Sequence, residues 1–140
     1  MSKVAVVYWS GTGNTQAMAE AIAEGAKGAG AETLLATPGD FNADMIKDFD
    51  AIAFGCPAMG AEELEDSEFL PMYEPCETKL SGKKVALFGS YGWGNGEWMR
   101  IWEKQVADKG AFLAADSLII NETPNDDELA TCRSFGAGLA

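Results

Sequence analysis

The stretch Val4-Ala5-Val6-Val7-Tyr8-Trp9 runs directly into Ser10-Gly11-Thr12-Gly13-Asn14-Thr15, and a helix-like segment follows. An almost unbroken apolar run is typical of a parallel strand that is covered on both faces. The turn after it carries three hydroxyls and one amide, but neither Lys nor Arg. Because the first N–H groups of a helix are unpaired and attract anions, a phosphate dianion can bind there without a cationic side chain.

This turn differs from the two common nucleotide-binding motifs. A nucleoside triphosphate loop requires a Lys for the terminal phosphates, and none is present. A dinucleotide fingerprint requires a third glycine where Gln16 stands. The pattern therefore predicts a site for one phosphate monoester, formed by Ser10, Gly11, Thr12, Gly13, Asn14 and Thr15. The alternative interpretation is an ordinary polar cap at the start of a helix.

Strand-like and helix-like segments alternate five times along the chain. Strands are predicted at residues 4–9, 32–36, 51–55, 84–89 and 112–121, and helices at 14–27, 42–49, 68–80, 97–109 and 125–139. This alternation indicates an α/β fold with a parallel sheet and helices on both of its faces. Because no linker or repeat interrupts it, we expect one domain over residues 1–140. Trp98 and Trp102, at helical spacing, are expected in the core.

Ligands of such sheets bind beyond the carboxyl ends of the strands, where the strand order reverses. This rule selects the loops after the first, third and fourth strands. They are residues 10–15, 56–66 and 90–97, which are also the unusual parts of the sequence. We therefore expect these three loops to form one site.

The loop after the fourth strand reads Ser90-Tyr91-Gly92-Trp93-Gly94-Asn95-Gly96. Its glycines permit close backbone approach to a ligand, and the indole of Trp93 offers a face on which a flat heteroaromatic ring can stack. The alternative is an indole that folds onto the protein's own surface.

The loop after the third strand contains Pro57, Ala58, Met59, Gly60, Ala61 and Glu62. Met59 is a candidate for the opposite face of the same ring, and Glu62 for a hydrogen bond from a ring N–H. Gly60 permits the preceding peptide to flip, because it lacks a Cβ. A plain structural loop is the alternative. Cys56 has no basic neighbour that would stabilise a thiolate, so we assign it no nucleophilic role.

Composition narrows the function further. The chain of 140 residues has no apolar stretch long enough for a membrane span and no signal-peptide pattern, so we expect a cytoplasmic protein. Three widely spaced cysteines argue against disulfides and against zinc or iron–sulfur sites. The absence of His excludes imidazole catalysis and imidazole metal ligands.

The net charge of −12 argues against nucleic acid and anionic membranes as partners, and favours proteins with a basic face. Two clusters hold much of the acidity. They consist of Glu62, Glu63, Glu65, Asp66 and Glu68, and of Glu122, Asp126, Asp127 and Glu128. Charge kept only for solubility is the alternative reading.

Taken together, the motifs Ser10–Thr15, Cys56–Gly60 and Ser90–Gly94 resemble those of flavodoxins, particularly the short-chain type of anaerobic bacteria. The resemblance covers the whole chain. It implies a doubly wound, five-stranded parallel sheet of order 2-1-3-4-5 that binds FMN; the order is the one known for flavodoxin. The strand at 112–121 lacks the insertion of about twenty residues that marks the long-chain type.

By this resemblance, Ser10, Thr12, Asn14, Thr15 and the loop amides would hold the FMN phosphate. Trp93 and Met59 would sandwich the isoalloxazine ring. Glu62 and the backbone at Ala61, Gly92 and Trp93 would meet the ring's pyrimidine edge, and the peptide at Gly60 would flip on one-electron reduction. Relatives often carry a hydroxyl residue where Pro57 stands, so one phosphate hydrogen bond is expected to be missing.

The implied function is low-potential one-electron transfer by bound FMN, with the semiquinone/hydroquinone couple at work. A monomer would shuttle electrons between redox proteins, namely basic-faced reductases and ferredoxin-dependent enzymes that dock at the acidic rim. The sequence supplies no nucleophile, general base or nicotinamide motif, so we expect no enzymatic turnover. Two alternatives remain: a small quinone or FMN reductase, and a phosphate-binding module without flavin.

Overall fold

The computed structural model describes residues 2–59, 63–92, 94 and 96–140. Its sheet has the strand order β2-β1-β3-β4-β5, and every pairing within it is parallel. The strands on this path are β2 (Glu32–Ala36), β1 (Lys3–Tyr8), β3 (Ala51–Gly55), β4 (Lys84–Tyr91) and β5 (Phe112–Leu113). The predicted order 2-1-3-4-5 is confirmed.

The predicted fifth strand is divided into two. Both β5 and β6 (Leu118–Asn121) pair with β4, and residues 114–117 separate them. Val85 pairs with Leu113, and Phe88 pairs with Leu118. Between these two pairs β4 advances by three residues, whereas the partner segment advances by five. Two extra residues therefore leave the ladder between the strands, in the short segment Ala-Ala-Asp-Ser that has little apolar surface to bury.

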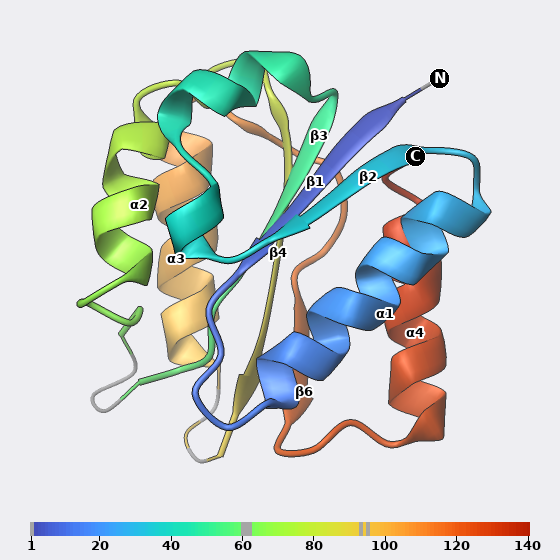
Figure 1. Cartoon of the computed structure of the whole chain (residues 1–140). Helices are drawn as coiled ribbons and strands as arrows, with labels where there is room; N and C mark the ends of the chain where they lie inside the picture. Colours follow the sequence, from blue (N-terminus) through green and yellow to red (C-terminus); the bar gives the residue numbers. More distant parts are fainter. Residues whose placement is uncertain (1, 60–62, 93, 95) are drawn as a thin grey trace.

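Helices cover both faces of the sheet (Figure 1). One face carries α1 (Asn14–Gly28) and α4 (Asp126–Ala137), and the other carries α2 (Phe69–Glu77) and α3 (Glu97–Asp108). The short helix predicted at 42–49 is the 3₁₀ helix η2 (Ala43–Asp48), and a second 3₁₀ helix, η1 (Pro38–Asp40), precedes it.

The sheet separates two apolar cores, because successive side chains of a strand point to opposite faces. Along β1, Val4 and Val6 pack with α1 and α4, whereas Ala5 and Val7 pack with α2 and α3. Trp98 and Trp102 are 2% and 1% exposed, as expected for core residues.

The two helical layers are packed differently. A Cβ built on Gly25 would lie 1.8 Å from the carbonyl oxygen of Arg133, and one on Gly136 would lie 1.9 Å from that of Ile22. These glycines therefore let α1 and α4 touch backbone to backbone. On the other face, large aromatic side chains fill the space between α2 and α3. No helix among the described residues is long and apolar enough to cross a membrane.

Candidate functional site

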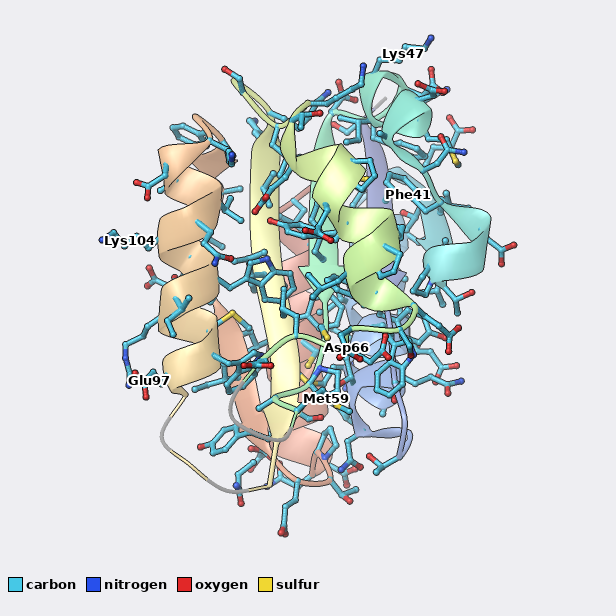
Figure 2. The ribbon with its side chains drawn as sticks, turned by 90° about the vertical axis from the view of Figure 1, so that its left-hand side faces the viewer. Phe41, Lys47, Met59, Asp66, Glu97 and Lys104 are labelled. Atoms are coloured by element: carbon cyan, nitrogen blue, oxygen red, sulfur yellow. The ribbon has the colours of Figure 1, made fainter. Side chains whose placement is uncertain are left out.

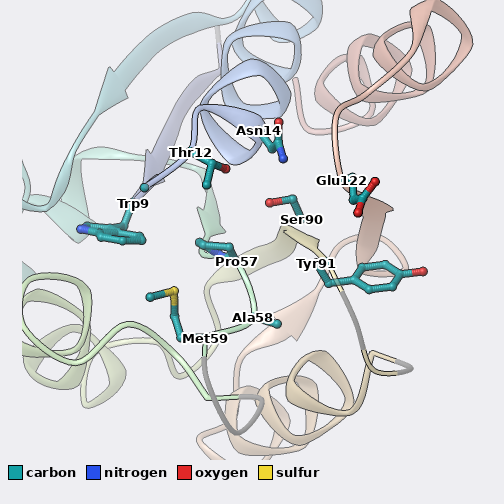
Figure 3. Close-up of a pocket in the computed structure, with 11 residues that line it drawn as sticks. Trp9, Thr12, Asn14, Pro57, Ala58, Met59, Ser90, Tyr91 and Glu122 are labelled. Atoms are coloured by element: carbon teal, nitrogen blue, oxygen red, sulfur yellow. The ribbon is translucent and has the colours of Figure 1, made fainter.

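The carboxyl ends of β1, β3 and β4 bring the three predicted loops together around one cavity of about 230 Å³ (Figure 3). The lining residues described by the structure come from these loops and from the end of β6. They are Trp9, Gly11, Thr12, Asn14, Pro57, Ala58, Met59, Ser90, Tyr91, Gly92 and Glu122. Nine of these eleven are candidate residues from the sequence, Tyr91 among them, and the other two are Trp9 and Glu122.

The polar end of the cavity is the start of α1. Gly13 has φ of +97°, a conformation that side-chain-bearing residues rarely adopt, and its N–H donates to the Ser10 hydroxyl at 3.1 Å. Thr12 and Asn14 line the cavity beside this turn. The turn therefore presents a helix N-terminus with polar side chains and no cationic group in the described lining, an arrangement that suits an anion.

Thr15 occupies a different position from the other polar residues of the turn. It is 1% exposed and does not line the cavity. Its hydroxyl lies 2.8 Å from the hydroxyl of Ser90 and accepts a hydrogen bond from the Ser90 N–H at 3.3 Å. The two side chains thus join the start of α1 to the end of β4, and only Ser90 of this pair reaches the lining.

The apolar end of the cavity is formed by Trp9, Pro57, Ala58 and Met59 (Figure 3). The Trp9 ring lies close to the backbone of Gly11, where an added Cβ would be 3.0 Å from it, and its indole N–H donates to Glu68 at 3.4 Å. The sequence analysis missed Trp9, although an aromatic residue directly before a ligand-binding turn is a usable signal.

Backbone pairing fixes the loop that carries Met59. Met59 and Glu63 exchange two hydrogen bonds of 2.9 and 3.0 Å, and the N–H of Ala58 donates to the carbonyl of Ser90 at 3.0 Å. Cys56 accepts a hydrogen bond from the Trp98 indole at its carbonyl oxygen, 3.2 Å away. The loop after β3 is therefore held to β4 and α3 at the level of the cavity.

Glu65 closes this loop with its side chain, which is 5% exposed. Its carboxylate accepts from the N–H groups of Ser67, Glu68 and Phe69, each at 2.8 Å, and from the Ser67 hydroxyl. Burial alone would raise the pKa of Glu65, but these hydrogen bonds outweigh it and lower the pKa to about 2. The charged carboxylate thus links the loop to the first turn of α2 by hydrogen bonds.

Glu122, the residue after β6, brings a carboxylate to the rim. It has φ of +56°, and its N–H donates to the carbonyl of Tyr91 at 2.7 Å. The neighbouring Thr123 hydroxyl donates to the Asn14 side chain at 3.2 Å, which joins this segment to the start of α1. In the sequence Glu122 stood out only as part of the second acidic cluster.

Several candidate residues are not placed at the cavity. Gly60, Ala61, Glu62 and Trp93 lie outside the described residues, so the predicted stacking, edge contact and peptide flip stay predictions. Ser10, Gly13, Thr15 and Gly94 are described but do not line the cavity.

The described lining contains one carboxylate and no thiol. Cys56 is fully buried, and burial raises the pKa of its thiol to about 12, so it does not form a thiolate at neutral pH. Among the residues that the structure describes, no three acidic or cysteine side chains converge as metal ligands. The arrangement offers binding by shape, dipoles and hydrogen bonds, with apolar and aromatic surface at one end and anion-binding N–H groups at the other.

Comparisons with known proteins agree with this geometry. The family model described as flavodoxin matches residues 6–136. The chain is 48% identical over 137 residues to a flavodoxin of Megasphaera elsdenii, covering 98% of each protein. It is 47% identical over 135 residues to one of Clostridium beijerinckii, covering 96% of this chain and 97% of that relative.

The fold agrees as well. The solution structure of two-electron reduced Megasphaera elsdenii flavodoxin superposes with a TM-score of 0.87, with 46% identity over 97% of both chains. A family model over nearly the whole chain, full-length relatives and a shared topology lead to the same assignment. The chain belongs to the flavodoxin family.

Proposed function

We propose that this chain is a low-potential one-electron carrier that holds FMN in the cavity beyond β1, β3 and β4 and passes electrons between redox proteins. Flavodoxins bind FMN and act in electron transfer. The observation that carries the proposal is the division of the cavity into a helix N-terminus without cationic side chains and an apolar wall that contains an indole and a thioether.

The residues present fit FMN. The phosphate suits the turn at Thr12 and Asn14, where the N–H groups at the start of α1 point outward and the glycines leave room for close approach. The flat ring system suits the surface formed by Ala58, Met59 and Trp9. Trp93 would add the second ring face that the sequence predicts.

When bound, FMN supplies the one-electron chemistry, and the chain supplies orientation and electrostatics. The Thr15–Ser90 hydrogen bond fixes the phosphate-binding turn relative to the loop after β4. The Met59–Glu63 pairing and the hydrogen bonds of the Glu65 carboxylate fix the segment on both sides of the loop that carries Met59, which would contact the ring. These contacts hold the described binding groups in place around the cavity.

The acidic rim sets the sign of the electrostatic effect. Glu122 lines the cavity, and Glu63, Asp66 and Glu68 are exposed on the segment that follows Met59. A carboxylate about 10 Å from an added electron costs roughly 0.4–1.7 kcal/mol for effective dielectric constants of about 80 to 20, or roughly 20–70 mV. Several carboxylates together lower the second one-electron potential. We therefore propose that the semiquinone/hydroquinone couple is the one used for electron transfer at low potential.

The same rim suggests the partners. We propose that basic-faced redox proteins dock where the cavity opens, guided by long-range attraction to a chain of net charge −12. The chain would act as a monomer of one domain without substrate turnover of its own. All three cysteines are free and buried, which fits a reducing compartment, and we propose the cytoplasm.

Stepwise dithionite reduction of the FMN-loaded protein, followed by visible spectra, tests the electron-carrier proposal. We expect two separate one-electron steps, with the second at the lower potential. A single two-electron step would contradict it. Mixing the protein with NADPH and a quinone distinguishes a carrier from a small reductase, because a reductase would oxidise NADPH unaided and a carrier would not.

A further inference from the structure

Thr123 lies in the short connection between β6 and α4, and this connection is held at both of its ends. The N–H of Glu122 and the side-chain amide of Asn121 both donate to the carbonyl of Tyr91, at 2.7 and 3.2 Å. At the other end, Pro124 restricts the backbone and a capping box begins α4. The backbone on both sides of Thr123 is therefore fixed relative to β4 and α4.

The backbone at Glu122 directs this connection toward the start of α1. Glu122 is the one non-glycine residue with positive φ, +56°, in the part of the chain that the structure describes. Such a conformation is strained and is found most often where a site requires it. The next residue, Thr123, donates from its hydroxyl to the side-chain carbonyl oxygen of Asn14 at 3.2 Å, across 109 positions of the sequence. The strained turn thus delivers a hydroxyl to a residue that lines the FMN cavity.

The two ends of the Asn14 amide differ in what they offer a ligand. The carbonyl oxygen only accepts hydrogen bonds, whereas the NH₂ group only donates them. Thr123 engages the oxygen, and the nitrogen donates to no other residue that the structure describes. In Figure 3 the nitrogen of Asn14 points toward Ser90 and the cavity, and the oxygen points away. The side chain therefore presents its donor end to the ligand.

This orientation matters because the described lining of the cavity contains neither Lys nor Arg. Figure 2 shows Lys47 toward the end of the molecule away from Met59. The carboxylate of Glu122, which also lines the cavity, adds a negative charge. A phosphate therefore depends on N–H and O–H donors. If the Asn14 amide were turned around, its carbonyl oxygen would face the phosphate oxygens, and the contact would repel instead of attract.

We propose that Thr123 is a positioning residue for the phosphate of FMN. Its hydroxyl holds the carbonyl oxygen of Asn14, so that the NH₂ group donates to a phosphate oxygen. The same hydrogen bond polarises the amide and makes its N–H a stronger donor. This inference rests on the proposed function, since it needs the phosphate to bind at the start of α1. It adds to the site a residue from the β6–α4 connection, which none of the sequence motifs contains.

Titration of the FMN-free protein with FMN and, separately, with riboflavin tests the inference, because riboflavin lacks only the phosphate. Tryptophan fluorescence reports binding. We expect Thr123→Val to weaken FMN binding about five- to tenfold, the effect of one hydrogen bond, and to change riboflavin binding less than about twofold. Thr123→Ser keeps the hydroxyl and should retain FMN affinity within about twofold of wild type. Thr131→Val is the matched control, because its exposed hydroxyl donates to a carbonyl of its own helix, and it should change neither affinity by more than about twofold.

A double variant shows whether Thr123 acts through Asn14. Asn14→Ala removes the amide itself, so adding Thr123→Val to it should cost no further FMN affinity. A full additional loss in the double variant would overturn the inference. Equal weakening of FMN and riboflavin by Thr123→Val would also overturn it, because that result would indicate a role in shaping the loop. An unchanged FMN affinity in Thr123→Val, or a loss in Thr123→Ser as large as that in Thr123→Val, would do the same.

The wild-type protein separates this inference from the proposed function. If wild type binds FMN no more tightly than riboflavin, the proposed phosphate site fails, and the role of Thr123 fails with it. If wild type prefers FMN and Thr123→Val keeps the full preference, only the role of Thr123 is refuted.

Discussion

Replacing Glu65 by Gln tests whether one carboxylate holds the loop beneath the FMN cavity. The wild-type carboxylate accepts hydrogen bonds from three backbone N–H groups at 2.8 Å and from the Ser67 hydroxyl. These hydrogen bonds lower its pKa from 4.5 to about 2. The shift corresponds to at most about 3 kcal/mol of stability at neutral pH. Since Asp66, Ser67 and Glu68 beside it are exposed and admit water, we expect Glu65→Gln to lower the free energy of unfolding by about 2 kcal/mol.

The pH dependence of this loss follows from the direction of the shift. Because the pKa is lower in the folded state, the contribution of Glu65 is fully present above about pH 4.5 and is lost as the pH falls through 2. In urea unfolding of the FMN-free protein, we therefore expect the difference in free energy of unfolding between wild type and Glu65→Gln to fall from pH 7 to pH 3. At pH 3 it should be less than half of its value at pH 7. Asp66→Asn, an exposed neighbour, is the control and should cost less than about 0.5 kcal/mol. A difference in free energy of unfolding that does not change with pH would refute the role of Glu65 in holding the loop, and so would an equal loss of stability in Asp66→Asn.

Three further variants probe the cavity. Thr15→Val removes the buried hydroxyl bonded to Ser90 and should cost about 1–2 kcal/mol of stability in urea unfolding; a loss below about 0.3 kcal/mol would mean that this bond does not hold the two loops together. Gly60→Ala should lower the first one-electron potential in a redox titration, because a Cβ opposes the predicted peptide flip, and an unchanged potential would remove that argument. Glu122→Gln takes a carboxylate from the rim and should raise the second potential by roughly 20–70 mV; a fall in that potential would contradict the electrostatic account.

Much of the fold follows from local patterns in the sequence. The strands at 32–36 and 51–55 end where turn-forming residues interrupt a short apolar run, and their predicted bounds match β2 and β3. Trp98 and Trp102 share one helix face, and this spacing placed them correctly in the core. Both results rest on periodicity, which is visible in a single segment.

The division of the last strand was not predictable in the same way. Residues 112–121 read as one strand, but the two-residue register shift against β4 depends on pairing between segments far apart in the chain. Likewise, the hydroxyl of Thr15 pairs with Ser90, 75 residues away. No local pattern distinguishes such a hydroxyl from one that faces a ligand, whereas the convergence of the three loops follows from topology alone.

Comparison of FMN with riboflavin tests the central claim most directly, because the two ligands differ only in the phosphate that the turn at residues 10–15 is proposed to hold. Titration of the FMN-free protein, followed by quenching of tryptophan fluorescence, should show FMN binding at micromolar concentration or below and riboflavin binding at least about 100-fold more weakly, since the phosphate supplies several charge-assisted hydrogen bonds. Equal affinities for the two ligands, or no binding of FMN at micromolar concentration, would contradict the account.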